Sequence, residues 1–205
     1  MHTITNDVVA LDALAVRASV ELVERARPAD MARPTPCADW TLHGLITHMT
    51  AQHYGFAAAA GGDGDLARWR PRRLGSDPAA GYRASAEAVL AAFSADGVLD
   101  RRFPLPEFAA GPDFPARQAV SFHLVDYVVH SWDVARTLGV QVHFTRELLD
   151  TALQVAQAVP GGEARLAPGA AFSPAVAWRD GPALDQVVAL LGRSPGWEPP
   201  GLPRP

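Results

Sequence analysis

Apolar residues recur at every third or fourth position through most of this chain, a spacing typical of helices with one buried face. The first such stretch runs from about Asn6 to Arg27 and ends at Pro28, a residue that helix interiors do not tolerate. The second begins after Thr41, whose hydroxyl suits an N-cap, and ends at the glycine pair that starts with Gly61.

Four further helices follow from the same periodicity and from capping residues. One opens at Asp77, which is followed directly by a proline in the first turn. The most apolar one spans about Pro115 to Leu138, and Gly139 closes it in the favoured position. Another runs from its cap at Thr145 to Pro160, and a short helix covers about Ala183 to Leu191.

The segments between these helices predict loops. Prolines make Arg33–Asp39 an extended loop, and residues 63–75 are rich in glycine and arginine. Val98–Phe114 holds three prolines, which allow a short hairpin but no central strand, and no strand pair is convincing. We therefore expect an all-α antiparallel bundle over residues 1–160, with a loop and a short helix in residues 161–205 packed on it as a C-terminal extension.

Composition and charge exclude several classes of function. All 18 basic residues are arginines, so no lysine can form a Schiff base. The formal net charge of −4 argues against nucleic-acid and anionic-membrane partners. The single cysteine, Cys37, rules out an internal disulfide, and we see neither a signal peptide nor a membrane-spanning run, so we expect a cytoplasmic protein.

Asp126 and His130 are the first candidates for chemistry. Four residues apart, they project from one helix face and suit two ligands of one metal ion. Leu124, Val125 and Val128 surround them, and a carboxylate among apolar side chains is costly unless a cation compensates it. The alternative interpretation is that the two side chains simply bond to each other.

A third ligand would come from another helix, and the second helix offers His43, His48 and His53. On a helical wheel His53 lies near the centre of the apolar stripe, whereas His48 lies at its flank. Periodicity alone slightly favours His53. Because a bundle helix touches two neighbours, a flank position can also face the interior, and the choice stays open at this point.

Three blocks of sequence carry a resemblance to a known family. They are Pro34–His48, which includes Trp40 and the second-helix cap, Asp126–Arg136, and Ala189–Trp197. The chain resembles the mycothiol-dependent maleylpyruvate isomerase N-terminal family of the DinB-like superfamily. The third block is typical of a metal-binding subgroup of that family. The resemblance implies an all-α, DinB-like antiparallel four-helix bundle.

The resemblance also implies a metal held by His48, Asp126 and His130. The isomerase has glutamate where this chain has Asp126, so the shorter carboxylate would draw the ion closer to its own helix. Two imidazoles and one carboxylate leave positions open for water or substrate, as in catalytic zinc sites. Zinc is the first candidate, and Ni²⁺ or Fe²⁺ would also accept this set.

The function implied is a metal-dependent S-transferase or isomerase that uses mycothiol or a similar thiol on a small electrophile. The tail after Pro160 is too short for the isomerase's second domain, which favours a transferase. The alternatives are a metal-dependent hydrolase and a metal-binding or small-molecule-binding module without turnover. The oligomeric state stays open, with a homodimer as one candidate, and no catalytic residue is assigned beyond the metal ligands.

Three other features are secondary candidates. Cys37 is a thiol close in sequence to the second helix, although a loop cysteine is more often a small packed residue. Arg68–Arg73 could clamp an anionic substrate, although a solvated loop is the simpler interpretation. Asp133 is a candidate partner for the far nitrogen of a ligating histidine, and Trp132 packs the end of the same helix.

Overall fold

The computed structural model describes residues 7–37, 40–107, 113–167, 170–178 and 181–200. Its α-helices are α1 (Val8–Val23), α2 (Leu42–Ala60), α3 (Pro78–Phe93), α4 (Ala116–Leu138), α5 (Arg146–Ala158) and α6 (Ala183–Leu190). Short 3-10 turns are η1 (Pro28–Asp30), η2 (Leu66–Trp69), η3 (Val98–Asp100) and η4 (Gly162–Arg165), and the strands are β1 (Arg102–Phe103) and β2 (Phe114–Pro115).

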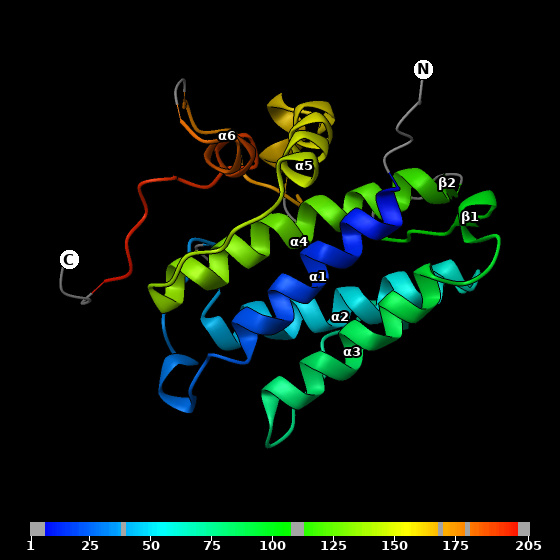
Figure 1. Ribbon diagram of the computed structural model, residues 1–205, viewed down its shortest axis with the longest axis horizontal. Helices are drawn as coiled ribbons and strands as arrows, with labels where there is room; N and C mark the ends of the chain where they lie inside the picture. The colour runs from blue at the N-terminus through cyan, green and yellow to red at the C-terminus, as the bar shows by residue number, and fades with distance from the viewer. Residues whose placement is uncertain (1–6, 38–39, 108–112, 168–169, 179–180, 201–205) are drawn as a thin grey trace.

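Helices α1 to α4 form a four-helix bundle, which confirms the predicted all-α fold class. Helix α1 packs along α4, α2 packs along α3, and the two pairs pack on each other. Figure 1 shows that α1 and α4 run in one direction and α2 and α3 in the other. The parallel pair α2 and α3 requires a long return connection, which residues 61–77 supply.

Capping side chains place the helix ends largely where the sequence predicts them. The side chains of Thr41, Asp77 and Thr145 accept hydrogen bonds from backbone N–H groups at the starts of α2, α3 and α5. Gly139 ends α4 with a φ of 71°, a conformation that glycine adopts without strain.

One boundary prediction is corrected. The first helix stops at Val23 rather than Arg27, because tighter i to i−3 hydrogen bonds replace the helical ones after it. No strand pair was convincing from the sequence, but the short hairpin that it allowed in this region is present, since β1 pairs with β2 in antiparallel register. Asn6, residues 38 and 39, and parts of the predicted 98–114 and 161–180 loops lie outside the described residues.

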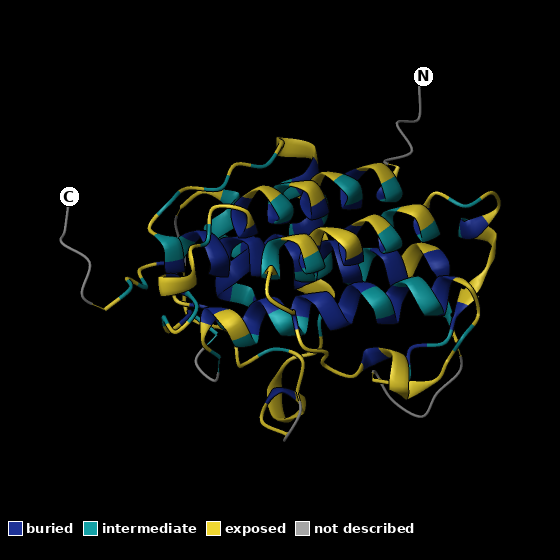
Figure 2. Cartoon of the chain, turned by 90° about the horizontal axis from the view of Figure 1, so that it is seen from below, coloured by how far each residue is buried: buried dark blue, intermediate teal, exposed yellow. Residues whose placement is uncertain are grey.

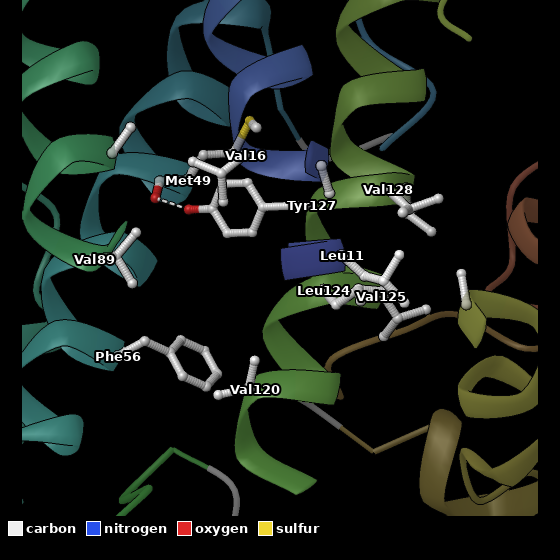
Figure 3. Close-up of a cluster of buried hydrophobic side chains, with 14 of the residues drawn as sticks. Leu11, Val16, Met49, Phe56, Val89, Val120, Leu124, Val125, Tyr127 and Val128 are labelled. Carbon is white, nitrogen blue, oxygen red and sulfur yellow. Dashed lines mark hydrogen bonds between the residues drawn. The ribbon is translucent and has the colours of Figure 1, made fainter. Parts of the chain in front are cut away.

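The apolar core lies between the four bundle helices. Figure 2 shows the buried positions turned inward and the exposed positions along the outer faces of the helices. Each bundle helix contributes to the cluster in Figure 3, for example through Val16, Phe56, Val89 and Leu124. Burial of this apolar surface is the main stabilising contribution to the fold.

A buried polar layer crosses this core, with one hydrogen bond at each contact between neighbouring bundle helices. The pairs are Asp12 with His123 (α1–α4, 2.7 Å), His53 with Ser85 (α2–α3, 2.8 Å), Ser19 with Tyr82 (α1–α3, 2.7 Å), and the hydroxyl of Tyr127 with the carbonyl of Met49 (α4–α2). Because an unpaired buried polar group is unfavourable, each bond selects one axial register for its pair of helices.

The C-terminal segment packs on the outside of the bundle. Helix α5 lies against α4, and α6 lies against α5 (Figure 1). The nearly buried guanidinium of Arg165 donates to the carbonyls of Pro160 and Val159, and so holds the segment after α5 together. The division into a bundle over residues 1–160 and an extension over 161–205 stays a prediction.

Within the described residues, no helix combines the length and apolar character needed to span a bilayer.

Gly55 provides a test of the packing between α2 and the connection that follows it. A Cβ added there would lie 2.2 Å from the indole of Trp69, which is almost completely buried. Gly55→Ala is therefore expected to lower the free energy of unfolding by about 1–3 kcal/mol, measured by urea denaturation.

Gly44→Ala is the matched control on the same helix, because its Cβ meets Trp40 at an ordinary 3.5 Å. Alanine is the better helix former, so this variant is expected to be at least as stable as the parent protein. Equal stability of the two variants would contradict the close packing of Trp69 on α2.

Candidate metal centre

His48, Asp126 and His130 converge between α2 and α4. His48 lies in the first half of α2, whereas Asp126 and His130 lie one turn apart on α4. One possible ligand atom from each side chain lies within 4.8 Å of the other two. The structure thus brings together the three side chains that the family resemblance singles out.

The spacing of the two candidate ligand atoms on α4 fits a tetrahedral ion. Nε2 of His130 lies 3.3 Å from Oδ1 of Asp126. Two ligands of a tetrahedral zinc ion, each bonded at about 2.0–2.1 Å, lie roughly 3.3–3.4 Å apart. Two imidazoles and a carboxylate are also a donor set that zinc prefers.

Hydrogen bonding orients His130 for this role. Its Nδ1 donates to Oδ2 of Asp133, at a distance of 3.0 Å. With the proton held at Nδ1, the lone pair of Nε2 faces Asp126 and is available to a metal. The expectation that Asp133 partners a candidate ligand thus agrees with the observed geometry.

Protonation of the three groups also suits a cation. Burial, followed by the charge of His130, lowers the pKa of His48 to about 4, so this imidazole is neutral near pH 7. Burial opposes ionisation of Asp126, but the charge and hydrogen bond of His130 outweigh it and lower the pKa of this carboxyl. Burial likewise opposes charge on His130, but Asp126 and then Asp133 raise its pKa to about 9. A divalent ion bound here would replace that proton.

The centre is partly exposed to solvent. The side chain of His130 is 3% exposed, whereas that of Asp126 is 20% exposed and His48 is partly exposed. The ring of Trp40 lies over His48 with ring centroids 4.3 Å apart and the two planes tilted by 31°, so it covers one face of the imidazole. This partial exposure is what a site that admits a small molecule requires.

Two contacts hold the α2 and α4 sides of the centre in place. The hydroxyl of Tyr127, the neighbour of Asp126, donates to the carbonyl of Met49, the neighbour of His48 (Figure 3). The hydroxyl of Thr35 donates to the carbonyl of Trp40, which fixes the loop that carries the indole. Hydrogen bonds that do not involve the three candidate ligands therefore hold the main chain on both sides of the centre.

The other two histidines of α2 lie elsewhere. His43 is exposed on the outer face. His53, which periodicity slightly favoured, is fully buried in the polar layer and bonds to Ser85. The helical wheel identified the most buried histidine of α2 correctly, but the histidine that meets Asp126 and His130 is His48, at the flank of the apolar stripe.

The secondary candidates have identifiable surroundings. Cys37 lies 3.5 Å from the guanidinium of Arg193, which also pairs with Asp133. In the arginine-rich loop, Trp69 packs edge-on against Phe56 at 5.0 Å rather than facing solvent. The proposed anion clamp in this loop stays a prediction.

Arg193 was not identified as a candidate from the sequence. It lies in the short block Ala189–Trp197, and nothing in that block indicates that its side chain contacts α4.

The fold and the arrangement of the site define the class of protein as a DinB-like four-helix bundle. The family model "Mycothiol maleylpyruvate isomerase N-terminal domain" matches residues 13–135, which is more than half of the 205-residue chain. The chain belongs to this family, and the resemblance inferred from the sequence blocks is confirmed.

Two relatives from Mycobacterium tuberculosis are similar to most of the chain. "Uncharacterized protein MT0763" of strain CDC 1551 / Oshkosh and "Uncharacterized protein Rv0738" of strain ATCC 25618 / H37Rv are each 28% identical over 179 residues. The similarity covers 84% of this chain and 90% of each relative. No solved structure matches the chain.

The buried imidazole of His53 predicts a specific pH dependence of stability. Burial holds its pKa well below the ordinary value of 6.5. Because the unfolded chain takes up a proton below about pH 6.5 and the folded one does not, acid favours unfolding by up to about 1.4 kcal/mol per pH unit. His53→Gln is expected to remove this contribution, measured by urea unfolding between pH 7.5 and 4.5.

Unfolding of wild type and of His53→Gln is measured in the presence of a metal chelator, so that loss of metal at low pH does not contribute to the difference in stability. The exposed His43→Gln variant reports the effect of removing a histidine outside the core. If wild type and His53→Gln lost stability in parallel as the pH falls, the assignment of a neutral, buried His53 would be wrong.

Proposed function

We propose that this protein binds one divalent metal ion, with zinc as the first candidate, through His48, Asp126 and His130, and uses it to transfer a low-molecular-weight thiol to a small electrophile. The observation that carries the proposal is the convergence of these three side chains at the partly exposed contact between α2 and α4. The thiol of the proposal is mycothiol or a close analogue.

The donor set supports catalysis more than a purely structural role. Structural zinc sites have four protein ligands, whereas three leave one position for an exchangeable molecule. The bundle also has an extensive core of its own, so it does not depend on a metal to fold. Exposure of the Asp126 side chain gives that open position a route to solvent.

Each side chain around the centre has a distinct part in the proposed reaction. His48 contributes a neutral imidazole and Asp126 an ionised carboxylate. Asp133 holds the proton on Nδ1 of His130, which keeps Nε2 directed at the shared position. Trp40 shields one face of His48 and limits access of water from that side.

The chemical role proposed for this arrangement is to increase the ionised fraction of a thiol. A free thiol with a pKa near 8.5 is only a few per cent ionised at pH 7, so its nucleophilic form is scarce. A divalent ion held by His48, Asp126 and His130 would supply positive charge that lowers the pKa of a thiol beside it, so that the thiol would release its proton to water, an effect equivalent to about 2 kcal/mol. The thiolate would then add to the electrophile and displace a leaving group, which departs with the bonding electrons, or it would add to a double bond and be eliminated after rotation, which gives the isomer.

Family membership supports the choice of thiol. The matched model is named for mycothiol and for an isomerase, and it includes both α2 and the part of α4 that carries Asp126 and His130. The names of the two mycobacterial relatives assign no activity.

Metal content tests the first half of the proposal. Elemental analysis of purified protein is expected to find about one divalent ion per chain, and His48→Ala and His130→Ala are each expected to lower it by about tenfold or more. His43→Ala removes an exposed histidine from the same helix and is expected to keep the wild-type content. Wild-type metal in both ligand variants would disprove the site.

The dependence of turnover on a thiol tests the second part of the proposal, the transfer of a thiol to an electrophile. The metal-loaded protein is expected to consume a bimane or haloaromatic electrophile more than about tenfold faster with mycothiol than without it. His48→Ala should lose this acceleration, whereas His43→Ala should retain it. Hydrolytic turnover without thiol would instead indicate a hydrolase, and bound metal without any turnover would indicate a binding module.

A further inference from the structure

The chain after α6 turns back toward α4 at Gly192. This residue has a φ of 84°, and a Cβ there would lie 2.6 Å from the carbonyl oxygen of Ser173, so both conformation and space require glycine. Beyond the turn, Arg136 of α4 donates to the carbonyl of Trp197 at 3.0 Å. Arg193 is thereby brought against the bundle helix that carries two of the proposed ligands.

The guanidinium of Arg193 joins three parts of the chain. It donates to Oδ2 of Asp133 on α4 at 3.2 Å, to Sγ of Cys37 in the loop before α2 at 3.5 Å, and to the carbonyl of Leu191 at 2.9 Å. The residue is only 4% exposed. A buried arginine with these partners has a defined position rather than a solvated one.

One carboxylate oxygen connects this arginine to the candidate metal centre. Oδ2 of Asp133 accepts from Arg193 and also from Nδ1 of His130. Asp133 is completely buried, and its other oxygen has no hydrogen-bond partner among the described residues. Arg193 therefore supplies a permanent positive charge beside this buried carboxylate, and its hydrogen bond helps to fix where the carboxylate lies.

We propose that Arg193 is a positioning residue of the metal centre, which fixes Asp133 and so holds the ring of His130 with Nε2 directed at Asp126. This inference rests on the metal site proposed above. Arg193 lies outside residues 13–135, which the family model matches. The segment that follows α6 therefore completes a centre whose proposed ligands all come from the bundle.

The experiment compares Arg193→Gln, Asp133→Asn and the double variant. Zinc affinity is measured by competition with a chromophoric chelator, and the visible spectrum of the Co²⁺-loaded protein reports the geometry around the ion. Each single substitution is expected to weaken binding by about 10–100-fold and to alter the spectrum. Because both break the same connection, the double variant is expected to bind no more weakly than the weaker single variant.

Arg165→Gln is the matched control. Arg165 is also a nearly buried arginine of the C-terminal segment, but its hydrogen-bond partners among the described residues are backbone carbonyls, including that of Pro160 at 2.8 Å. This variant is expected to have a lower melting temperature with unchanged zinc affinity and Co²⁺ spectrum. Arg193→Lys keeps the charge and is expected to recover part of the affinity, and it replaces the glutamine variant if that one fails to fold.

The outcomes separate this inference from the proposed function. Wild-type zinc affinity in Arg193→Gln, or losses that add in the double variant, would overturn the role of Arg193 and leave the metal site standing. The same loss of affinity in Arg165→Gln would also overturn it, because general loosening of the segment would then explain the effect. If wild type itself bound neither zinc nor cobalt, the proposed function and this inference would both be wrong.

Discussion

The four buried polar bonds between neighbouring bundle helices are the constraint on which the rest of the structure depends. Apolar packing is tolerant of small axial shifts, since many side chains fill the same space almost equally well. A buried hydrogen bond has no such tolerance, because a shift of one turn would leave both partners unpaired. Asp12 with His123 and His53 with Ser85 therefore determine how the helices are aligned, while the apolar residues determine that they associate at all.

The candidate metal centre uses this alignment directly. Its two halves lie on α2 and α4, and the bond from Tyr127 to Met49 joins residues next to a proposed ligand on each helix. The distance between His48 and the pair on α4 thus follows from the register of the bundle. A site built in this way does not need the metal to assemble it, which agrees with a catalytic role. Burial and neighbouring charges also determine the protonation states of the three side chains: they lower the pKa of His48 and Asp126 and raise that of His130.

Local signals in the sequence predicted the elements of the fold well. Thr41, Asp77, Thr145 and Gly139 act through their own backbone neighbours, so their effects can be deduced without a three-dimensional structure. The pairing of Asp126 with His130 is equally local, since one helical turn separates them.

The remaining features depend on which faces of distant helices meet. Periodicity ranked His53 above His48 because it measures depth in the core and not the direction of a particular neighbour. The same limit applies to Asp12 and His123, whose polar side chains interrupt apolar helices without any sequence signal that they face each other. Arg193 is the hardest of these residues to place from the sequence, because the turn at Gly192 determines which part of the bundle its side chain contacts.

The bond between Asp12 and His123 also has a consequence for how the chain folds during its synthesis. The two residues are separated by 111 positions, and they close the ring of helices by joining the first to the last. At about 5–20 residues per second, Asp12 leaves the ribosome roughly 6–22 s before His123 does. During that time Asp12 has no His123 to bond to, so burial of its carboxylate becomes favourable only when α4 packs against α1.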